Sequence, residues 1–324
     1  MNIQEILSTQ EFKLAQSVSG VNIVVIGCGG TGSKLIRDLC QAMAATKRLL
    51  PELPIMALLA DHDVVEKKNR DRQNFTDYDV GQLKSVCLAE RYTEAFGIPI
   101  KAVTKIVDSH DDLAVLINSG FETKVPLTGF GYHRNDNYGK DTLVITCVDN
   151  HQTRKLVSEY FLNHAPVYWL DLGNEATTGQ FCVGFNSPAD RWNYEYISRF
   201  DLPCSTELFP DILEAAGDIK PSDLPCGEGG AQELNVNAVM ASTAMSWICS
   251  YFRAIVNIQS NTTARDPKLT KVCNYYSVSI GIDPPKQEPI LATPQRLSKI
   301  KWGSAERQLR NQRRYEEHIQ TQAA

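Results

Sequence analysis

Short runs of apolar residues alternate along the first part of the chain with stretches in which apolar residues recur at helical spacing. A continuous apolar run is typical of a strand buried on both faces, whereas recurrence every three or four residues indicates an amphipathic helix. The alternation predicts an α/β fold, a Rossmann-like, doubly wound and mostly parallel sheet. We expect its strands near residues 24–26, 55–60, 101–107, 143–148, 167–172 and 179–185.

The pattern changes after residue 185. Residues 186–232 contain several prolines and no clear period, which predicts a long loop or crossover segment. The stretch 234–255 is helical in pattern and mostly apolar, so we expect a buried helix followed by a strand pair around 274–282. Within the first part, residues 120–141 are rich in Gly, Asn and Asp and predict an insertion.

These patterns divide the chain into three parts. Residues 1–21 form a lead-in, residues 22–283 form the α/β domain with its crossover region at 186–232, and residues 284–324 form a polar, basic tail. A charged segment of this kind is usually solvated, and we expect it to be helical in part. The helix and strands after residue 232 would then be C-terminal additions to the sheet.

Composition narrows the class of protein. The 324 residues are 43% hydrophobic and 22% charged, as in an ordinary globular protein. A net charge of −5 disfavours a general nucleic-acid binder, and neither a membrane-spanning run nor a signal-peptide pattern is expected. The nine cysteines are scattered without a C-x-x-C pair, which favours a reduced, cytoplasmic setting.

A glycine-rich turn follows the first apolar run. Gly27, Gly29 and Gly32 give the pattern G-x-G-x-x-G, with Gly30 beside them, and a helical pattern resumes immediately. Glycines allow backbone N–H groups at a helix N-terminus to approach a phosphate. The pattern alone indicates either a nucleotide-binding turn or a purely structural one.

Polar residues follow the strand expected at 55–60. Asp61 stands where an acidic residue binds ribose hydroxyls in dinucleotide-binding folds. The run beyond it brings cations to the edge where a parallel sheet places its ligand, and a triphosphate needs cations there. A solvated loop is the alternative. The candidate residues are Asn69, Arg72, Gln73 and Lys84.

Asp149 and Asn150 end the strand expected at 143–148 and precede a helix. A carboxylate at this edge of the sheet is a natural Mg²⁺ ligand. Both residue types also favour the N-cap of a helix, so one residue can cap while the other binds metal.

The motifs IGCGGTGS, ADHDVVEKKNRDRQNF, DVGQLKS, CVDNHQTR and LDLGNEATTGQ occur in this order. Together they resemble the ThiF/MoeB and ubiquitin-activating-enzyme adenylyltransferases. The stretches YWLDLGN and LFPD are most similar to the ThiF-family protein of bacterial PRTRC cassettes. The resemblance covers residues 22–250.

The resemblance implies a reaction and a set of roles. Such enzymes bind ATP and Mg²⁺, and the C-terminal carboxylate of a ubiquitin-like protein, usually ending in glycine, attacks the α-phosphate to give an acyl-adenylate and pyrophosphate. A homodimer formed through the sheet domain is expected. Carried over, the glycine turn and the polar run would contact the phosphates, with Arg72 and Lys84 offsetting charge. Asp61 would hold the ribose, Asp149 would bind Mg²⁺, and Asn150 would help to place the nucleotide.

The chain also departs from that family. Members often bind a structural zinc through two C-x-x-C pairs, but here only Cys204 and Cys273 stand near those places, so we expect no zinc. Several relatives supply an arginine in trans from the N-terminal helix. Residues 1–20 contain no arginine, and Lys13 is the basic candidate.

Cys226 stands where some relatives have a thiol that accepts the activated acyl group. A thiolate near a helix N-terminus would be a good nucleophile, which predicts a thioester. An inert core cysteine is the alternative.

Two further functions remain open from the sequence. A nicotinamide-dependent oxidoreductase would use the same glycine turn but leaves Arg72, Lys84 and Asp149 without a role. A non-catalytic scaffold subunit of a ThiF-like complex would not need to retain those three residues.

Overall fold

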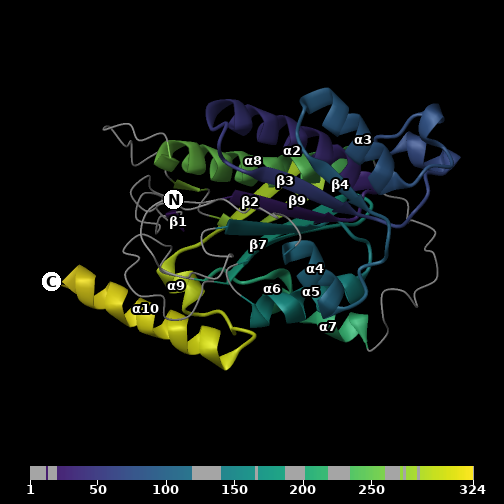
Figure 1. Cartoon of the computed structure of the whole chain (residues 1–324). Helices are drawn as coiled ribbons and strands as arrows, with labels where there is room; N and C mark the ends of the chain where they lie inside the picture. Colours follow the sequence, from purple (N-terminus) through teal and green to yellow (C-terminus); the bar gives the residue numbers. More distant parts are fainter. Residues whose placement is uncertain are drawn as a thin grey trace.

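The computed structural model describes residues 12–13, 20–118, 140–164, 167–186, 201–217, 234–259, 271–272, 275–282 and 285–323 (Figure 1). The strands are β1 (Phe12–Lys13), β2 (Gly20–Ile26), β3 (Ile55–Ala60), β4 (Ile100–Val103), β5 (Lys140–Thr146), β6 (Val167–Asn174), β7 (Thr178–Asn186), β8 (Lys271–Val272), β9 (Tyr275–Ile282) and β10 (Pro285–Leu291). The α-helices are α2 (Gly30–Leu49), α3 (Lys84–Phe96), α4 (His110–Asn118), α5 (His151–Asn163), α6 (Ser205–Leu208), α7 (Asp211–Ala216), α8 (Leu234–Gln259), α9 (Pro294–Leu297) and α10 (Ala305–Ala323). Two short 3₁₀ helices, η1 (Lys67–Asp71) and η2 (Asp77–Asp79), precede α3.

Eight strands form the main sheet in the order β10-β9-β7-β6-β5-β2-β3-β4. The strands β6, β5, β2, β3 and β4 are parallel, and β7, β9 and β10 extend the sheet with antiparallel pairs. The chain reverses its direction of winding between β2 and β5, since β3 and β4 lie on one side of β2 while β5 and β6 lie on the other. This is the predicted doubly wound, mostly parallel α/β fold, and the reversal is where such sheets bind ligands.

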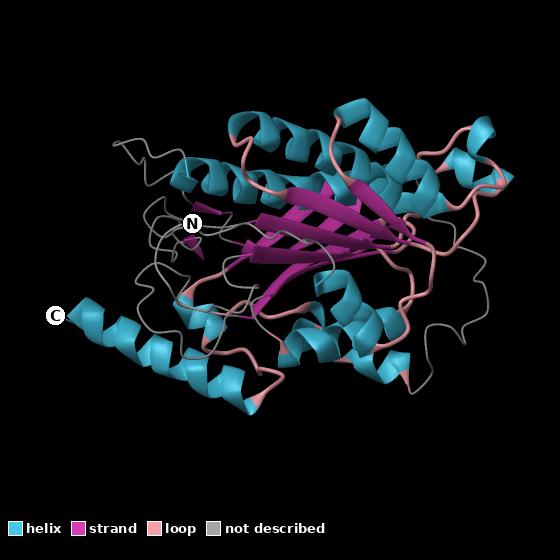
Figure 2. Cartoon of the chain, in the orientation of Figure 1, coloured by secondary structure: helices cyan, strands magenta, loops and turns pink. Residues whose placement is uncertain are grey.

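Helices cover both faces of the sheet (Figure 2). The strand β2 is buried along its whole length, and its side chains alternate between two cores: Val21, Ile23 and Val25 enter one, Val24 and Ile26 the other. The first core contains α2, α3 and α8, and the second contains α4 and α5. Because neither face of β2 meets water, its side chains are apolar on both faces, apart from the buried Asn22, whose amide donates to the Ile117 carbonyl oxygen at 2.8 Å.

The helix α8 packs against α2 and against β6, β7 and β9. Among the described helices it is the one long and apolar enough to cross a membrane, judged by length and composition only. Its apolar window, however, is 61% buried inside the chain, as in the core helix of a globular protein. The length and the apolar composition of α8 are therefore explained by its packing within the fold.

The segment after β4 differs from its prediction. The strand ends at Val103, whereas the apolar pattern predicted a strand to residue 107. Lys105, Ile106 and Val107 leave the sheet and line a cavity instead. The prediction of a long loop or crossover segment at residues 186–232 is also corrected in part, because residues 201–217 contain the helices α6 and α7.

The expectation of a solvated tail from residue 284 is wrong for residues 285–311, whereas the described side chains of α10 beyond residue 311 are mostly exposed, as expected. The strand β10 pairs with β9 at the edge of the main sheet. Trp302 is buried, and Arg307 in α10 is 1% exposed. Its guanidinium donates to the backbone oxygens of Phe185 and Leu202 and to the Glu207 carboxylate. Residues 285–311 are therefore part of the folded body.

Three other predictions lie largely or wholly outside the described residues. These are the lead-in apart from β1, the insertion at 120–141 apart from the start of β5, and the segment 218–233 that contains Cys226. Lys13 lies in β1, which pairs with β8, and the role suggested for it stays a prediction.

Asp141 near the start of β5 makes the stability of the fold dependent on pH. The Tyr251 hydroxyl of α8 donates to Asp141 Oδ2 at 2.7 Å, and burial raises the pKa of this carboxyl to about 6. The folded chain then holds this proton more tightly than the unfolded chain, so the free energy of unfolding falls as pH rises from 3.8 to about 6. Asp141→Asn should be more stable than the wild type above that range by up to about 3 kcal/mol.

Urea unfolding at about pH 4 and about pH 7 measures this difference, which should nearly vanish at the lower pH. Glu52→Gln, at an exposed position, is the control and should show no such dependence. An equal effect of Asp141→Asn at both pH values would contradict the prediction.

Candidate functional site

A cavity of about 220 Å³ lies at the carboxyl ends of the parallel strands, at the reversal between β2 and β5. Its walls are the β2–α2 turn, the end of β3 with the η1 segment, the first residue of α3, the segment after β4, the β5–α5 turn and the end of β6. Ten residues singled out in the sequence line it: Gly27, Gly29, Gly30, Asp61, Asn69, Arg72, Gln73, Lys84, Asp149 and Asn150. Residues from six separate segments thus converge on one place.

The glycine turn separates into two roles. Gly27 has φ +96°, and a Cβ there would lie 2.6 Å from the Cys147 carbonyl oxygen. A Cβ on Gly32 would lie 2.1 Å from the Gly27 carbonyl oxygen, so Gly32 packs against the turn and does not line the cavity. By contrast, nothing lies nearer than 4.0 Å to the place of a Cβ on Gly29. Gly27 and Gly32 shape the turn, while Gly29 leaves room for a ligand.

The helix α2 begins at this turn, and its N-cap residue provides no side-chain hydrogen bond. The N-cap residue Gly29 has no side chain to accept from the first N–H groups, and the first turn contains no acidic residue. Helix N-terminal N–H groups and the helix dipole together favour an anion. The twenty-residue length of α2 makes it a full helix for this purpose.

Asp61 at the end of β3 holds the glycine turn. Its Oδ2 accepts from the backbone N–H of Cys28 at 2.6 Å, and its Oδ1 accepts from the N–H of Asp63 at 2.8 Å. Burial raises the pKa of this carboxyl, and Lys84 nearby opposes that shift. Each carboxylate oxygen has a second lone pair, so Asp61 can still accept from a ligand hydroxyl.

Lys84 is the first residue of α3 and is 7% exposed. Its Nζ donates to Asp63 Oδ2 at 2.7 Å, and its backbone N–H donates to the Asp63 carbonyl oxygen at 2.8 Å. Asp63 therefore fixes the lysine at the cavity. Nothing in the sequence singles out Asp63, although it lies in the motif ADHDVVEKKNRDRQNF.

Asn69 is buried and shapes the η1 segment. Its Oδ1 accepts from the backbone N–H of Glu66 at 2.8 Å, and its carbonyl oxygen accepts from the N–H of Gln73 at 2.8 Å. These bonds turn the chain so that Arg72 and Gln73 face the cavity. Asn69 thus acts on the site largely by positioning its neighbours.

The β5–α5 turn distinguishes its two candidates. Asn150 is the N-cap of α5, and its Oδ1 accepts from the Thr153 N–H at 2.8 Å. Asp149 is exposed at the cavity, and no hydrogen bond or ion pair joins its carboxylate to the residues that the structure describes. The capping role and the free carboxylate are therefore divided between the two residues.

A buried ion pair fixes this turn. Arg154 Nε donates to Asp171 Oδ1 at 3.1 Å, and an Arg154 Nη2 donates to the Val148 carbonyl oxygen at 2.6 Å. The Thr146 hydroxyl donates to the same Asp171 oxygen at 2.5 Å. Arg154 and Asp171 lie in two quoted motifs, CVDNHQTR and LDLGNEATTGQ, but the sequence gave no reason to pair them.

Asp61, His62 and Asp63 offer ligand atoms within 4.8 Å of one another and are a second place where a cation could be held. Asp63 is already paired with Lys84, and both oxygens of Asp61 accept backbone N–H groups. Asp149 has no such commitments among the described residues, so its carboxylate fits Mg²⁺ better.

The fold is a doubly wound α/β sheet, and the cavity at its switch point combines the N-terminus of α2 with Arg72 and Lys84, groups that favour an anion. The chain belongs to the ThiF family, whose model matches residues 3–203. It is 26% identical over 211 residues to ubiquitin-like modifier-activating enzyme 6 of Mus musculus, and 27% identical over 205 residues to the Homo sapiens protein of that name. Each match covers 62% of this chain and 17% of the relative.

Among solved structures, E. coli MccB in complex with AMPCPP and selenomethionine MccA is similar with a TM-score of 0.50 and 17% identity. The likeness covers 84% of this chain and 64% of that one, and it concerns the fold. The chain thus spans less than a fifth of the curated relatives and less than two thirds of MccB. The particular similarity to the protein of PRTRC cassettes stays a prediction.

Proposed function

We propose that this chain is an adenylyltransferase that activates the C-terminal carboxylate of a ubiquitin-like polypeptide with ATP. The observation that carries the proposal is one cavity that combines the N-terminus of α2 with Arg72, Lys84 and Asp149; within the described part of the chain, neither that N-terminus nor the Asp149 carboxylate has a side-chain partner. Membership of the ThiF family supports it. The ubiquitin-like modifier-activating relatives and the MccB complex with AMPCPP and MccA also support it.

The proposed step forms one bond and breaks another. An oxygen of the substrate carboxylate bonds to the α-phosphorus of ATP, and the bond from that phosphorus to the bridging β-oxygen breaks. Pyrophosphate leaves with the electron pair, and an acyl-adenylate remains. The chain contributes mainly position and electrostatics to such a step.

The cavity residues divide this work. Gly29, Gly30 and the α2 N-terminus would bind the phosphates, and Asp61 would accept from a ribose hydroxyl. Arg72 and Lys84 would offset the negative charge that grows on the phosphates, while Asn69, Gln73 and Asn150 would keep the walls in place. Asp149 would hold Mg²⁺, which supplies further neutralisation of the leaving pyrophosphate.

The alternatives explain fewer of these residues. A nicotinamide-dependent oxidoreductase would use the glycine turn and Asp61, but it needs neither two cations nor a free carboxylate beside the phosphates. A scaffold subunit needs none of them. We also propose that the chain forms a homodimer and works in the cytoplasm. A further proposal is that the acyl group is transferred to Cys226, and a thioester assay on non-reducing gels would test this transfer.

ATP–pyrophosphate exchange tests the proposed function. The purified chain with Mg²⁺ and a ubiquitin-like polypeptide ending in glycine should exchange labelled pyrophosphate into ATP, and omission of the polypeptide should abolish the exchange. The control is the same polypeptide with its C-terminal carboxylate amidated, which cannot attack phosphorus. Exchange that is equal with the amidated polypeptide, or absent with a panel of such polypeptides despite ATP binding, would contradict adenylation.

A further inference from the structure

A buried cluster of one hydroxyl and two amides lies at the β6 side of the cavity. Asn237 in the first turn of α8 accepts at Oδ1 from the Thr31 hydroxyl at 2.9 Å and from Asn174 Nδ2 at 2.7 Å. Thr31 belongs to the first turn of α2, and Asn174 ends β6. Thr31 and Asn174 line the cavity, whereas Asn237 is 0% exposed and lies behind them.

The Asn237 amide has a donor that no described group accepts. Its Nδ2 is buried and has no hydrogen-bond partner among the residues that the structure describes. The same nitrogen lies 2.6 Å from the place of a Cβ on Gly30, the first residue of α2 and part of the cavity wall. An unpaired buried N–H is costly, so such a group calls for an explanation. Here it adds a donor beside a helix N-terminus whose own N–H groups also lack a cap.

The order of the strands indicates which end of a ligand this cluster meets. Asp61 and Val107 follow β3 and β4, on one side of β2. Asn174 ends β6, on the other side of β2 and beyond β5. A nucleotide with its ribose at Asp61 and its phosphates over the β2–α2 turn leaves the β6 side to the group that attacks it.

We propose that Asn237 is a positioning residue for the attacking carboxylate of the polypeptide substrate. Through its Oδ1 it fixes the cavity-lining side chains of Thr31 and Asn174, and it adds an N–H to the positive N-terminus of α2. The proposal rests on the adenylation function proposed above. In this proposal, the β6 side of the cavity binds an acyl substrate whose terminal carboxylate lies next to a peptide group.

Asn237→Asp separates this role from a structural one. The aspartate keeps an oxygen that can accept from Thr31 and Asn174, but it replaces the N–H₂ donor with a negative charge. We expect the KM for the ubiquitin-like polypeptide in the exchange assay to rise about 10- to 100-fold, while the Kd for ATP measured without polypeptide changes less than about threefold. Asn235→Asp is the matched control, because it introduces the same charge at an exposed position of the same helical turn.

Thr31→Val provides a second variant that adds no charge and removes the hydroxyl on the cavity side. It should raise the KM for the polypeptide selectively as well. Thermal melting of both variants shows whether they are folded.

The outcomes separate the two proposals. A folded Asn237→Asp or Thr31→Val chain with unchanged KM values, or with an equal loss of ATP and polypeptide affinity, would overturn the inference and leave adenylation standing. A wild-type chain that binds ATP but shows no exchange with any ubiquitin-like polypeptide would overturn both.

Discussion

Replacing Arg72 with alanine is expected to lower the rate of ATP–pyrophosphate exchange by about 10²- to 10³-fold. Arg72 follows η1 and lines the cavity together with Lys84 and Asp149. Negative charge accumulates on the phosphates as the carboxylate attacks and pyrophosphate leaves. A cation fixed beside them stabilises this transition state more than the bound ground state, so kcat should fall more than the affinity for ATP.

Arg70→Ala is the matched control for this variant. Arg70 lies two residues earlier in η1, is exposed and pairs with Asp77, and it does not line the cavity. It removes the same charge from the same segment and should leave exchange nearly unchanged. Equal losses in the two variants would show that net charge, rather than a placed guanidinium, matters. Arg72→Lys should recover only part of the rate, because lysine lacks the planar fork of donors.

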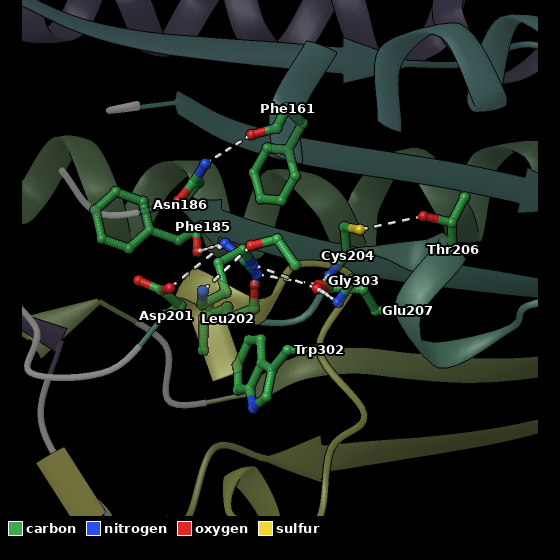
Figure 3. A network of polar contacts seen from close by, with 12 residues as sticks. Phe161, Phe185, Asn186, Asp201, Leu202, Cys204, Thr206, Glu207, Trp302 and Gly303 are labelled. Atoms are coloured by element: carbon green, nitrogen blue, oxygen red, sulfur yellow. Dashed lines mark hydrogen bonds and ion pairs between the residues drawn. The ribbon is translucent and has the colours of Figure 1, made fainter. Parts of the chain in front are cut away.

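Replacing Arg307 with alanine should destabilise the fold by about 3–5 kcal/mol. The Arg307 side chain is 1% exposed, and the side chains of Asp201 and Glu207, with which it pairs, are 0% and 2% exposed. Asp201 and Glu207 lie on opposite sides of this polar network, with Trp302 next to it (Figure 3). Its guanidinium also lies 5.1 Å from the centre of the Phe161 ring and 5.0 Å from that of Trp302. Without it, the buried Glu207 carboxylate keeps, among the described residues, only backbone donors, the N–H groups of Cys204 and Gly303.

Equilibrium unfolding in urea measures this loss, with Arg313→Ala as the control at an exposed position of the same helix. The control should change the free energy of unfolding by less than about 0.5 kcal/mol. Because Arg310 also donates to Asp201 at 2.6 Å, the expected loss lies toward the lower end of the range. Adding Glu207→Gln to Arg307→Ala should recover part of it, since the uncompensated charge is then removed. A loss of less than about 1 kcal/mol for Arg307→Ala would contradict the role assigned to this residue.

The central strands could be predicted from the sequence because burial on both faces requires a run of apolar residues. Val24, Val25 and Ile26 form an apolar run only because helices cover both sides of β2. The edge strand β10 has no such apolar run. Its sequence PKQEPIL is mostly exposed, as edge strands often are, and its polar residues therefore predict a polar tail rather than a strand.

Arg307 was missed for a related reason. A sequence shows the charge of α10 but not the two carboxylates that meet it, and Glu207 lies 100 residues away along the chain. The prediction of a solvated segment follows the usual behaviour of charged runs. It fails here because paired charges can be buried when each finds its partners.

Some residues of the candidate site could likewise be predicted from the sequence, and others could not. The position of the glycine turn, Asp61 and Asp149 at the cavity could be predicted, because each stands beside a recognisable strand. Asn237 could not, since it lies 206 residues from Thr31 and its helix reads simply as apolar. Contacts between the ends of distant elements are set by topology, and no local pattern encodes them.

Transfer of an isotope from the substrate carboxylate to AMP tests most directly whether this cavity activates a carboxylate at the α-phosphorus. The chain is incubated with ATP, Mg²⁺, hydroxylamine and a ubiquitin-like polypeptide labelled with ¹⁸O in its C-terminal carboxylate. Attack at the α-phosphorus predicts AMP that contains one ¹⁸O atom, together with unlabelled pyrophosphate and a polypeptide hydroxamate. Label in inorganic phosphate with release of ADP, or AMP without label, would contradict adenylation.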